Sequence, residues 1–146
     1  MNEGERFRAF TLLINNISRD IRKIKSDEMS NFNLKSPHVS CLYHLYNEQS
    51  LTAKELCEIC GEDKSSISRS IDYLIANGYV QNDICAKKHY KNPIQLTDIG
   101  KEAGRILSKR IDDILYEASI GMTEEERTIL YKSLSLIHQN LQNLLK

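Results

Sequence analysis

The change in hydrophobic period after Gly78 constrains the fold of this chain most strongly. Up to that residue, positions 63–78 carry apolar side chains three or four apart, which is the spacing of an amphipathic helix. Beyond it, residues 79–84 and 90–96 alternate in the manner of two short antiparallel strands around a basic turn. The sequence therefore predicts a helix that is followed directly by a β hairpin.

Two further helices are expected before this one. Thr52 and Glu55 have the spacing of a reciprocal capping box at the start of a helix of barely two turns, and Asp63 can cap the helix that follows. Pro37 favours the start of an earlier helix, since proline is well tolerated at a first helical position. Three helices and a hairpin over residues 37–96 indicate a winged helix-turn-helix.

Long amphipathic helices flank this unit. Apolar residues three and four apart run through residues 5–26 and 98–145, and Gly121 with a capping box at Thr123 divides the second segment into two helices. The expected fold class is mainly α with a small antiparallel β hairpin. Each apolar stripe could pack within one chain, but three long helices around so small a unit are better explained as dimerisation helices.

Composition sets bounds on location and on partners. The chain has 146 residues, and its 20 basic and 20 acidic side chains cancel, so support for a nucleic-acid partner must come from their local distribution. No stretch reaches the roughly 18 apolar residues of a membrane span, and the N-terminus is charged. We expect a cytoplasmic protein without membrane contact, without a cofactor, and with its four cysteines as free thiols.

Four segments resemble the MarR family of winged helix-turn-helix transcription regulators. They are Glu55-Leu56-Cys57, Asp63-Lys64-Ser65-Ser66-Ile67-Ser68-Arg69, Gly78-Tyr79-Val80 and Leu96-Thr97-Asp98-Ile99-Gly100. By its pattern of elements the resemblance covers nearly all of residues 1–146. It implies a homodimer that binds double-stranded DNA at a near-palindromic operator, and we expect a repressor.

The resemblance and helix geometry together predict the DNA-binding residues. With apolar positions 67, 71 and 74 on one face, Ser65 and Arg69 fall on the opposite face, where Arg69 could contact guanine and Asp72 could orient it as an ion pair. The hairpin tip lacks the Asp-x-Arg pattern common in the family and is rich in lysine instead, which suits phosphate contacts. The predicted DNA-binding set is Thr52, Lys64, Ser65, Ser66, Ser68, Arg69, Lys87, Lys88, His89 and Lys91.

The second helix is expected to border an effector site. Its core stripe is predicted to be Val39, Leu42, Tyr43 and Tyr46, with Cys41 and His44 pointing roughly the other way. Family members receive small ligands in a crevice beside this helix, and some sense oxidants there. The resemblance therefore implies a pocket for a small aromatic or oxidant effector near Cys41, Tyr43 and His44, while an ordinary free thiol and groups that simply face solvent are the alternatives.

Cys57-x-x-Cys60 has the spacing of half a zinc or thiol-redox motif. It lies in a predicted helix whose buried side would be Leu56, Ile59 and Cys60, and no second pair completes a metal site. We therefore expect small core residues and no metal.

The sequence also bears on three other functions. The sequence has no phosphate-binding glycine loop, activated nucleophile motif or paired-carboxylate signature, so an enzyme is not expected. A thiol-based redox regulator of the same fold is an alternative. A winged-helix module that binds protein rather than DNA is another, because the net charge of zero permits it.

Overall fold

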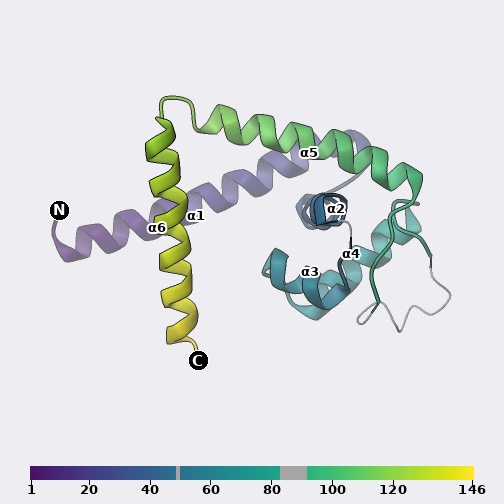
Figure 1. Ribbon diagram of the computed structural model, residues 1–146, viewed down its shortest axis with the longest axis horizontal. Helices are drawn as coiled ribbons and strands as arrows, with labels where there is room; N and C mark the ends of the chain where they lie inside the picture. Colours follow the sequence, from purple (N-terminus) through teal and green to yellow (C-terminus); the bar gives the residue numbers. More distant parts are fainter. Residues whose placement is uncertain (49, 83–91) are drawn as a thin grey trace. The chain divides into compact units, whose positions relative to one another are not determined.

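The computed structural model describes residues 1–48, 50–82 and 92–146, and it divides into two compact units. The first unit comprises residues 1–111 and the second residues 112–146. Among the described residues the structure is α-helical apart from a few bridged positions (Figure 1), which confirms the predicted mainly α fold. The helices are α1 (Glu3–Glu28), the 3-10 turn η1 (Ser30–Phe32), α2 (Ser36–Glu48), α3 (Ala53–Cys60), α4 (Lys64–Ala76), α5 (Asp98–Ala118) and α6 (Glu124–Leu144).

Helix α2 is central to the first unit. Figure 1 shows it end-on, and it contacts α1, α3 and α4. Val39, Leu42 and Leu45 of α2 are almost completely buried together with Leu56 of α3 and Leu74 of α4. One apolar core therefore joins the helices of the helix-turn-helix.

The predicted orientation of α2 is wrong for one residue. Cys41 does not point away from the core, because its exposed fraction is only 1%. Tyr43 and Tyr46, which the sequence pattern assigns to the core stripe, are half-buried. The physical reason is that three helices pack around α2, so a single stripe underestimates how much of its circumference is covered.

The predicted helix caps of the helix-turn-helix are confirmed. Thr52 and Glu55 form the reciprocal capping box at the start of α3. Gly61 ends that helix with a φ of 64°, a left-handed conformation that glycine adopts without steric cost. Asp63 Oδ1 then accepts a hydrogen bond of 2.7 Å from the backbone N–H of Ser66. These caps fix where α3 ends and α4 begins.

The base of the predicted hairpin is present. Val80 and Leu96 form an antiparallel bridge, and Gln81 N–H donates to the carbonyl of Gln95 at 2.8 Å. A second antiparallel bridge, between Leu51 and Ile94, adds a third segment that the sequence did not predict. The tip of the hairpin, residues 83–91, lies outside the described residues.

Hydrogen bonds of Thr97 hold the start of α5 against the hairpin. Thr97 Oγ1 accepts a hydrogen bond from Gly100 N–H at 3.0 Å and donates one to the carbonyl of Gly78 at 2.6 Å. A Cβ atom on Gly100 would lie 2.0 Å from the carbonyl oxygen of Tyr79. The last glycine of Leu-Thr-x-x-Gly is therefore needed because the backbone of the hairpin crosses the helix there.

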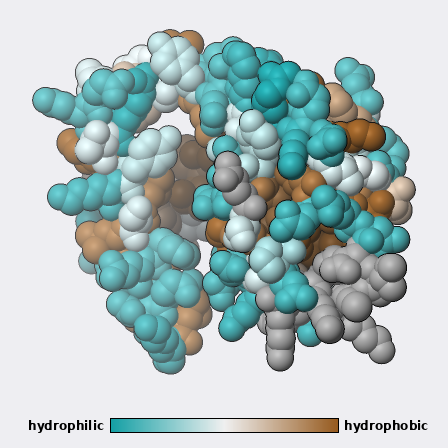
Figure 2. All heavy atoms as spheres, turned by 45° about the vertical axis from the view of Figure 1, so that its right-hand side comes forward, coloured by the Kyte–Doolittle hydropathy of each residue, from teal (hydrophilic) through white to brown (hydrophobic). Residues whose placement is uncertain are grey.

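The predicted amphipathic helices α1 and α6 form, but in these two described helices no residue is buried. Phe7 of α1 is 73% exposed, and other large apolar side chains of both helices are exposed as well. Apolar surface is visible between hydrophilic side chains in Figure 2. In the described part of the chain, no helix combines the length and the hydrophobicity that a membrane span requires.

The second unit contains the turn into α6. Thr123 and Glu126 form the predicted capping box, and Gly121 adopts a φ of 96°. The Arg127 guanidinium bonds Glu124 and the backbone carbonyl of Ser119. These contacts give the turn a defined conformation independently of the first unit.

Candidate nucleic-acid interface

Helix α4 has one buried and one exposed face, as predicted. Ile67, Ile71 and Leu74 are nearly inaccessible and pack into the core. Ser68 and Arg69 are exposed, together with Ser65 in the first turn. A helix anchored in this way presents a small polar surface with one arginine, which is the form of surface that can enter a major groove.

The predicted ion pair between Arg69 and Asp72 is wrong. Both side chains are exposed, and the structure records no ion pair between these two described residues. An exposed pair gains little Coulomb energy in water and loses side-chain entropy, so three-residue spacing alone does not enforce it. The Arg69 guanidinium is not oriented by Asp72.

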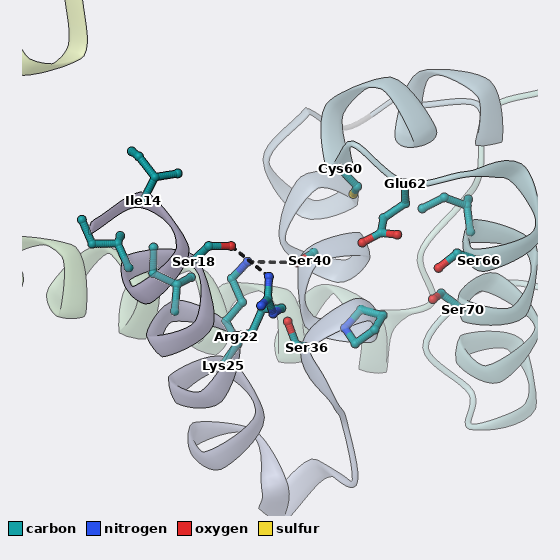
Figure 3. Close-up of a pocket in the computed structure, with 14 residues that line it drawn as sticks. Ile14, Ser18, Arg22, Lys25, Ser36, Ser40, Cys60, Glu62, Ser66 and Ser70 are labelled. Atoms are coloured by element: carbon teal, nitrogen blue, oxygen red, sulfur yellow. Dashed lines mark hydrogen bonds between the residues drawn. The ribbon is translucent and has the colours of Figure 1, made fainter. Parts of the chain in front are cut away.

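Other members of the predicted DNA-binding set differ in their surroundings. Lys64 is exposed at the first position of α4. The Thr52 hydroxyl is already engaged, because it accepts from Glu55 N–H at 3.2 Å and donates to Glu55 Oε1 at 3.0 Å. Ser66 is half-buried and faces a cavity rather than the Arg69 side of the helix (Figure 3). The predicted wing residues Lys87, Lys88, His89 and Lys91 lie outside the described residues.

The sequence did not predict this cavity, which lies between α1, α2, the end of α3 and α4. Its volume is about 410 Å³. Arg22 and Lys25 enter it from α1, and Figure 3 shows Lys25 Nζ donating to Ser40 Oγ at 3.0 Å. Burial lowers the pKa of Lys25, with a smaller contribution in the same direction from Arg22. The signal that could have found the cavity is the polar run Ser18, Arg22 and Lys25 beside the isoleucine stripe of α1.

The predicted effector residues do not line this cavity. Cys41 lies in the core, whereas Tyr43 and His44 are half-buried neighbours whose rings meet edge to face, with centroids 5.2 Å apart. Burial, followed by the charge of Lys25, lowers the pKa of His44. The cavity is lined instead by other residues of α2, namely Ser36, Pro37 and Ser40.

The Cys-x-x-Cys residues lie in α3 as expected, and both are half-buried against the core. Ile59 was expected on the buried side of the helix, and this is wrong, because it is 42% exposed. The described residues contain no cluster of three or more histidine, cysteine or acidic side chains that could hold a metal ion. Interaction with the Cys41 thiol of α2 lowers the pKa of the Cys60 thiol, against the opposing effect of burial.

Part of the chain is similar to a known protein family. The sequence profile of the MarR family matches residues 32–85, which span the helix-turn-helix and the first half of the hairpin. An uncharacterised HTH-type transcriptional regulator of Bacillus subtilis, YwaE, is 26% identical over 119 residues, or 82% of this chain and 70% of YwaE. Residues 32–85 therefore match the MarR family of helix-turn-helix transcriptional regulators.

Solved structures show that the MarR fold extends over almost the whole chain. The Staphylococcus aureus MepR–DNA complex matches with a TM-score of 0.78 and 19% identity over 90% of this chain and 96% of MepR. A Listeria monocytogenes protein assigned to the MarR family, complexed with a 26mer DNA, matches with a TM-score of 0.77 and 23% identity over 89% of this chain and 87% of its own. The match of residues 32–85 to a family of transcription regulators agrees with the expectation that the chain is not an enzyme.

Proposed function

We propose that this chain is a MarR-family regulator that acts in the cytoplasm as a homodimeric repressor and reads a near-palindromic operator. The exposed face of α4 carries the proposal, because Arg69 and two serines stand on a helix whose opposite face is fixed in the core. Arg69 would make the bidentate contact that guanine favours, and Ser65 and Ser68 would allow close approach of the backbone to the duplex.

Homodimerisation is supported by the apolar side chains of α1 and α6. A second copy would cover these stripes and place two copies of α4 on one DNA duplex. Successive major grooves on one face lie about 34–36 Å apart, so the dimer would set the spacing of the operator half-sites. Two-fold symmetry of the protein would then require near-palindromic DNA.

The wing is proposed to bind the DNA backbone. Lys87, Lys88 and Lys91 follow one another with His89 and without an acidic residue, next to a hairpin base that is tied to α5. Lysines in such a position contact phosphates and release counterions, which adds affinity for every sequence. The structurally similar MepR has been crystallised with DNA, which supports a DNA-binding function.

Control by a small aromatic or oxidant effector is proposed beside α2. Tyr43 and His44 supply an aromatic pair there, and Cys41 of the same helix is buried in the core. An effector that weakens operator binding must itself bind the DNA-bound dimer less tightly, because the coupling between two binding sites is reciprocal. Titration of the operator complex with aromatic acids, repeated with Tyr43→Ala, tests the site, and release that is unchanged in the variant would contradict it.

Two substitutions test whether α4 reads the DNA sequence while the wing binds the phosphate backbone. Arg69→Ala should weaken binding to a selected operator by about 1–3 kcal/mol and relax its sequence preference. Lys88→Ala should weaken binding to all sequences and lower the slope of affinity against salt by about one unit. Arg8→Ala, on the exposed surface of α1, is the matched control. Equal losses of specific and non-specific affinity in both test variants would contradict the proposal.

One observation favours a second candidate, a winged-helix module that binds protein. The chain has no net charge, so its surface as a whole does not attract DNA. Binding to heparin that weakens steeply with salt would support the DNA-binding function. Retention that is independent of salt, with no DNA fragment enriched by selection, would favour the protein-binding module.

A further inference from the structure

The short turn between α1 and α2 receives a phenol from each of the two elements that are proposed to contact DNA. The Tyr73 hydroxyl of α4 donates a hydrogen bond to the backbone carbonyl of Asn33. The Tyr79 hydroxyl, at the base of the hairpin, donates to the neighbouring carbonyl of Phe32 at 3.2 Å. The two bonds join segments that are 40 and 47 residues apart in the chain.

The two acceptors lie where a helical turn ends. Phe32 is the last residue of η1, and Asn33 caps that turn in a left-handed conformation with a φ of 57°. Carbonyl groups at the end of a helical turn have no partner within the turn, and they bind water unless another donor reaches them. Here two tyrosines from distant elements supply the donors.

The turn also has a fixed place in the first unit. Met29 and Leu34, at its two ends, are each only 2% exposed. The backbone N–H of Ser36, at the start of α2, donates to the Ser26 hydroxyl of α1 at 3.0 Å. The turn is therefore tied to both helices that it connects, and a displacement of the end of α1 would move the two carbonyl groups with it.

Tyr73 holds α4 on the side that faces away from the core. It follows Arg69 by one helical turn, so the two side chains leave the helix on neighbouring faces, whereas Ile67 and Ile71 are buried on the opposite face. The His38 ring of α2 stacks on the Tyr73 ring, with centroids 3.9 Å apart. Apolar attraction has no direction, but a hydrogen bond does. The phenol bond thus limits the rotation of α4 and the direction in which Arg69 projects.

Tyr79 holds the hairpin in a similar way. Its side chain is buried, and its backbone carbonyl accepts a hydrogen bond from Thr97 N–H at 3.1 Å. The next residue, Val80, forms the antiparallel bridge with Leu96. The phenol bond to Phe32 therefore joins the base of the hairpin to the same turn that is joined to α4.

We propose that Tyr73 and Tyr79 are positioning residues that align α4 and the hairpin with the end of α1, a role that rests on the proposed function of a DNA-binding homodimer. Helix α1 carries one of the apolar stripes that a second copy would cover. In that dimer the phenol bonds fix the distance and the rotation between the two copies of α4. They thereby set the spacing of the operator half-sites that the dimer accepts.

The first measurement needs no DNA. A Tyr73→Phe, Tyr79→Phe double variant keeps both rings and removes both hydrogen-bond donors. Backbone amides 33–35 should exchange with solvent severalfold faster in this variant, because the turn loses two bonds that hold it. Tyr46→Phe is the matched control, since its hydroxyl has no hydrogen-bond partner among the described residues. Thermal unfolding of each variant shows whether the variant is folded.

The second measurement compares two operators. One is a selected operator, and the other has one additional base pair between its half-sites, which rotates one half-site by about a tenth of a helical turn. The ratio of the two affinities should fall severalfold in the double variant, because its two copies of α4 adapt more easily to the altered spacing. Loss of folded protein would lower both affinities equally and leave the ratio unchanged. Arg69→Ala should likewise lower both affinities and keep the ratio.

Each part of the proposal has its own contradicting result. Unchanged exchange at residues 33–35 would overturn the tie between the turn and the tyrosines. Faster exchange with an unchanged affinity ratio would overturn the positioning role and leave the proposed function intact. A natural protein that is monomeric or binds no DNA would contradict the proposed function, and the positioning role with it. If the double variant does not fold, Tyr73→Phe alone, at a half-buried position, should show smaller changes in the same directions.

Discussion

Helices α4 and α6 carry apolar residues at the same three- and four-residue spacing, but the two stripes have different surroundings. In α4, Ile67 and Leu74 are almost completely buried in the core. In α6, Leu134 and Ile137 remain 37% and 36% exposed, and no residue of that described helix is buried. Spacing therefore predicts that a stripe exists, but it does not say what covers it. For α4 the cover is the rest of the helix-turn-helix, and for α1 and α6 we propose a second copy of the chain.

The largest effect is expected for a truncation inside the core. Leu42→Ala should lower the free energy of unfolding by about 2–5 kcal/mol, because it removes a fully buried side chain and leaves a cavity. Leu141→Ala, at a half-exposed position of α6, is the matched variant. It should lower the free energy of unfolding mainly at low protein concentration. Denaturant unfolding at two protein concentrations distinguishes them. Equal losses of stability in both variants, independent of protein concentration, would contradict the proposed difference between the core and α6.

A smaller effect is expected where the backbone of α5 meets the hairpin. Gly100→Ala should destabilise the protein by about 1–3 kcal/mol, because the new Cβ would lie 2.0 Å from a backbone oxygen that cannot move freely. Gly4→Ala in α1 is the control, since its Cβ would meet only the Asn2 side chain at 3.6 Å. Thermal unfolding should show a lower midpoint for Gly100→Ala and an unchanged or slightly higher one for Gly4→Ala. A neutral Gly100→Ala variant would refute the close approach.

The cap of α4 should contribute about 1 kcal/mol. Asp63→Ala removes the acceptor of the 2.7 Å hydrogen bond to Ser66 N–H, whereas Asp63→Asn keeps a side-chain oxygen in the same place. Urea unfolding should therefore separate alanine from asparagine by that amount. If the two variants were equally stable, the side-chain oxygen of Asp63 would not be what stabilises the start of α4.

The smallest effect concerns His38, which packs on α4 through a ring stack with Tyr73 at 3.9 Å. Its Nδ1 accepts a hydrogen bond from Lys35 N–H at 3.2 Å, and burial, followed by the charge of Lys35, lowers the pKa of its imidazole. The unfolded chain therefore takes up this proton first, so stability should fall as the pH drops below about 6.5. His38→Phe keeps an aromatic ring without a titrating group. Its stability should change less between pH 7 and pH 5, and an equally steep decline would contradict this assignment.

Local signals predicted most of the helix-turn-helix. Capping residues such as Thr52 and Asp63 act within one turn of their own position, so sequence spacing was sufficient to locate the helix starts. The buried face of α4 was predicted correctly for the same reason. The base of the hairpin also agrees with the prediction, through the bridge between Val80 and Leu96.

Features that depend on contacts between distant segments were missed. Cys41 is buried because three helices surround α2, and no single-helix pattern contains that information. The bridge of Leu51 to Ile94 and the cavity that contains Lys25 and Cys60 likewise join segments far apart in the chain. The DNA-binding and effector residues remain predictions, because their roles depend on partners outside the chain.

The mass of the protein in solution tests the central claim most directly. If a second copy covers α1 and α6, sedimentation equilibrium at micromolar concentration should give twice the chain mass of 16.8 kDa. With a selected operator, the complex should contain two chains per duplex, and Leu134→Glu should reduce both mass and operator affinity. A free mass of one chain, together with operator binding by one chain per duplex, would contradict the account.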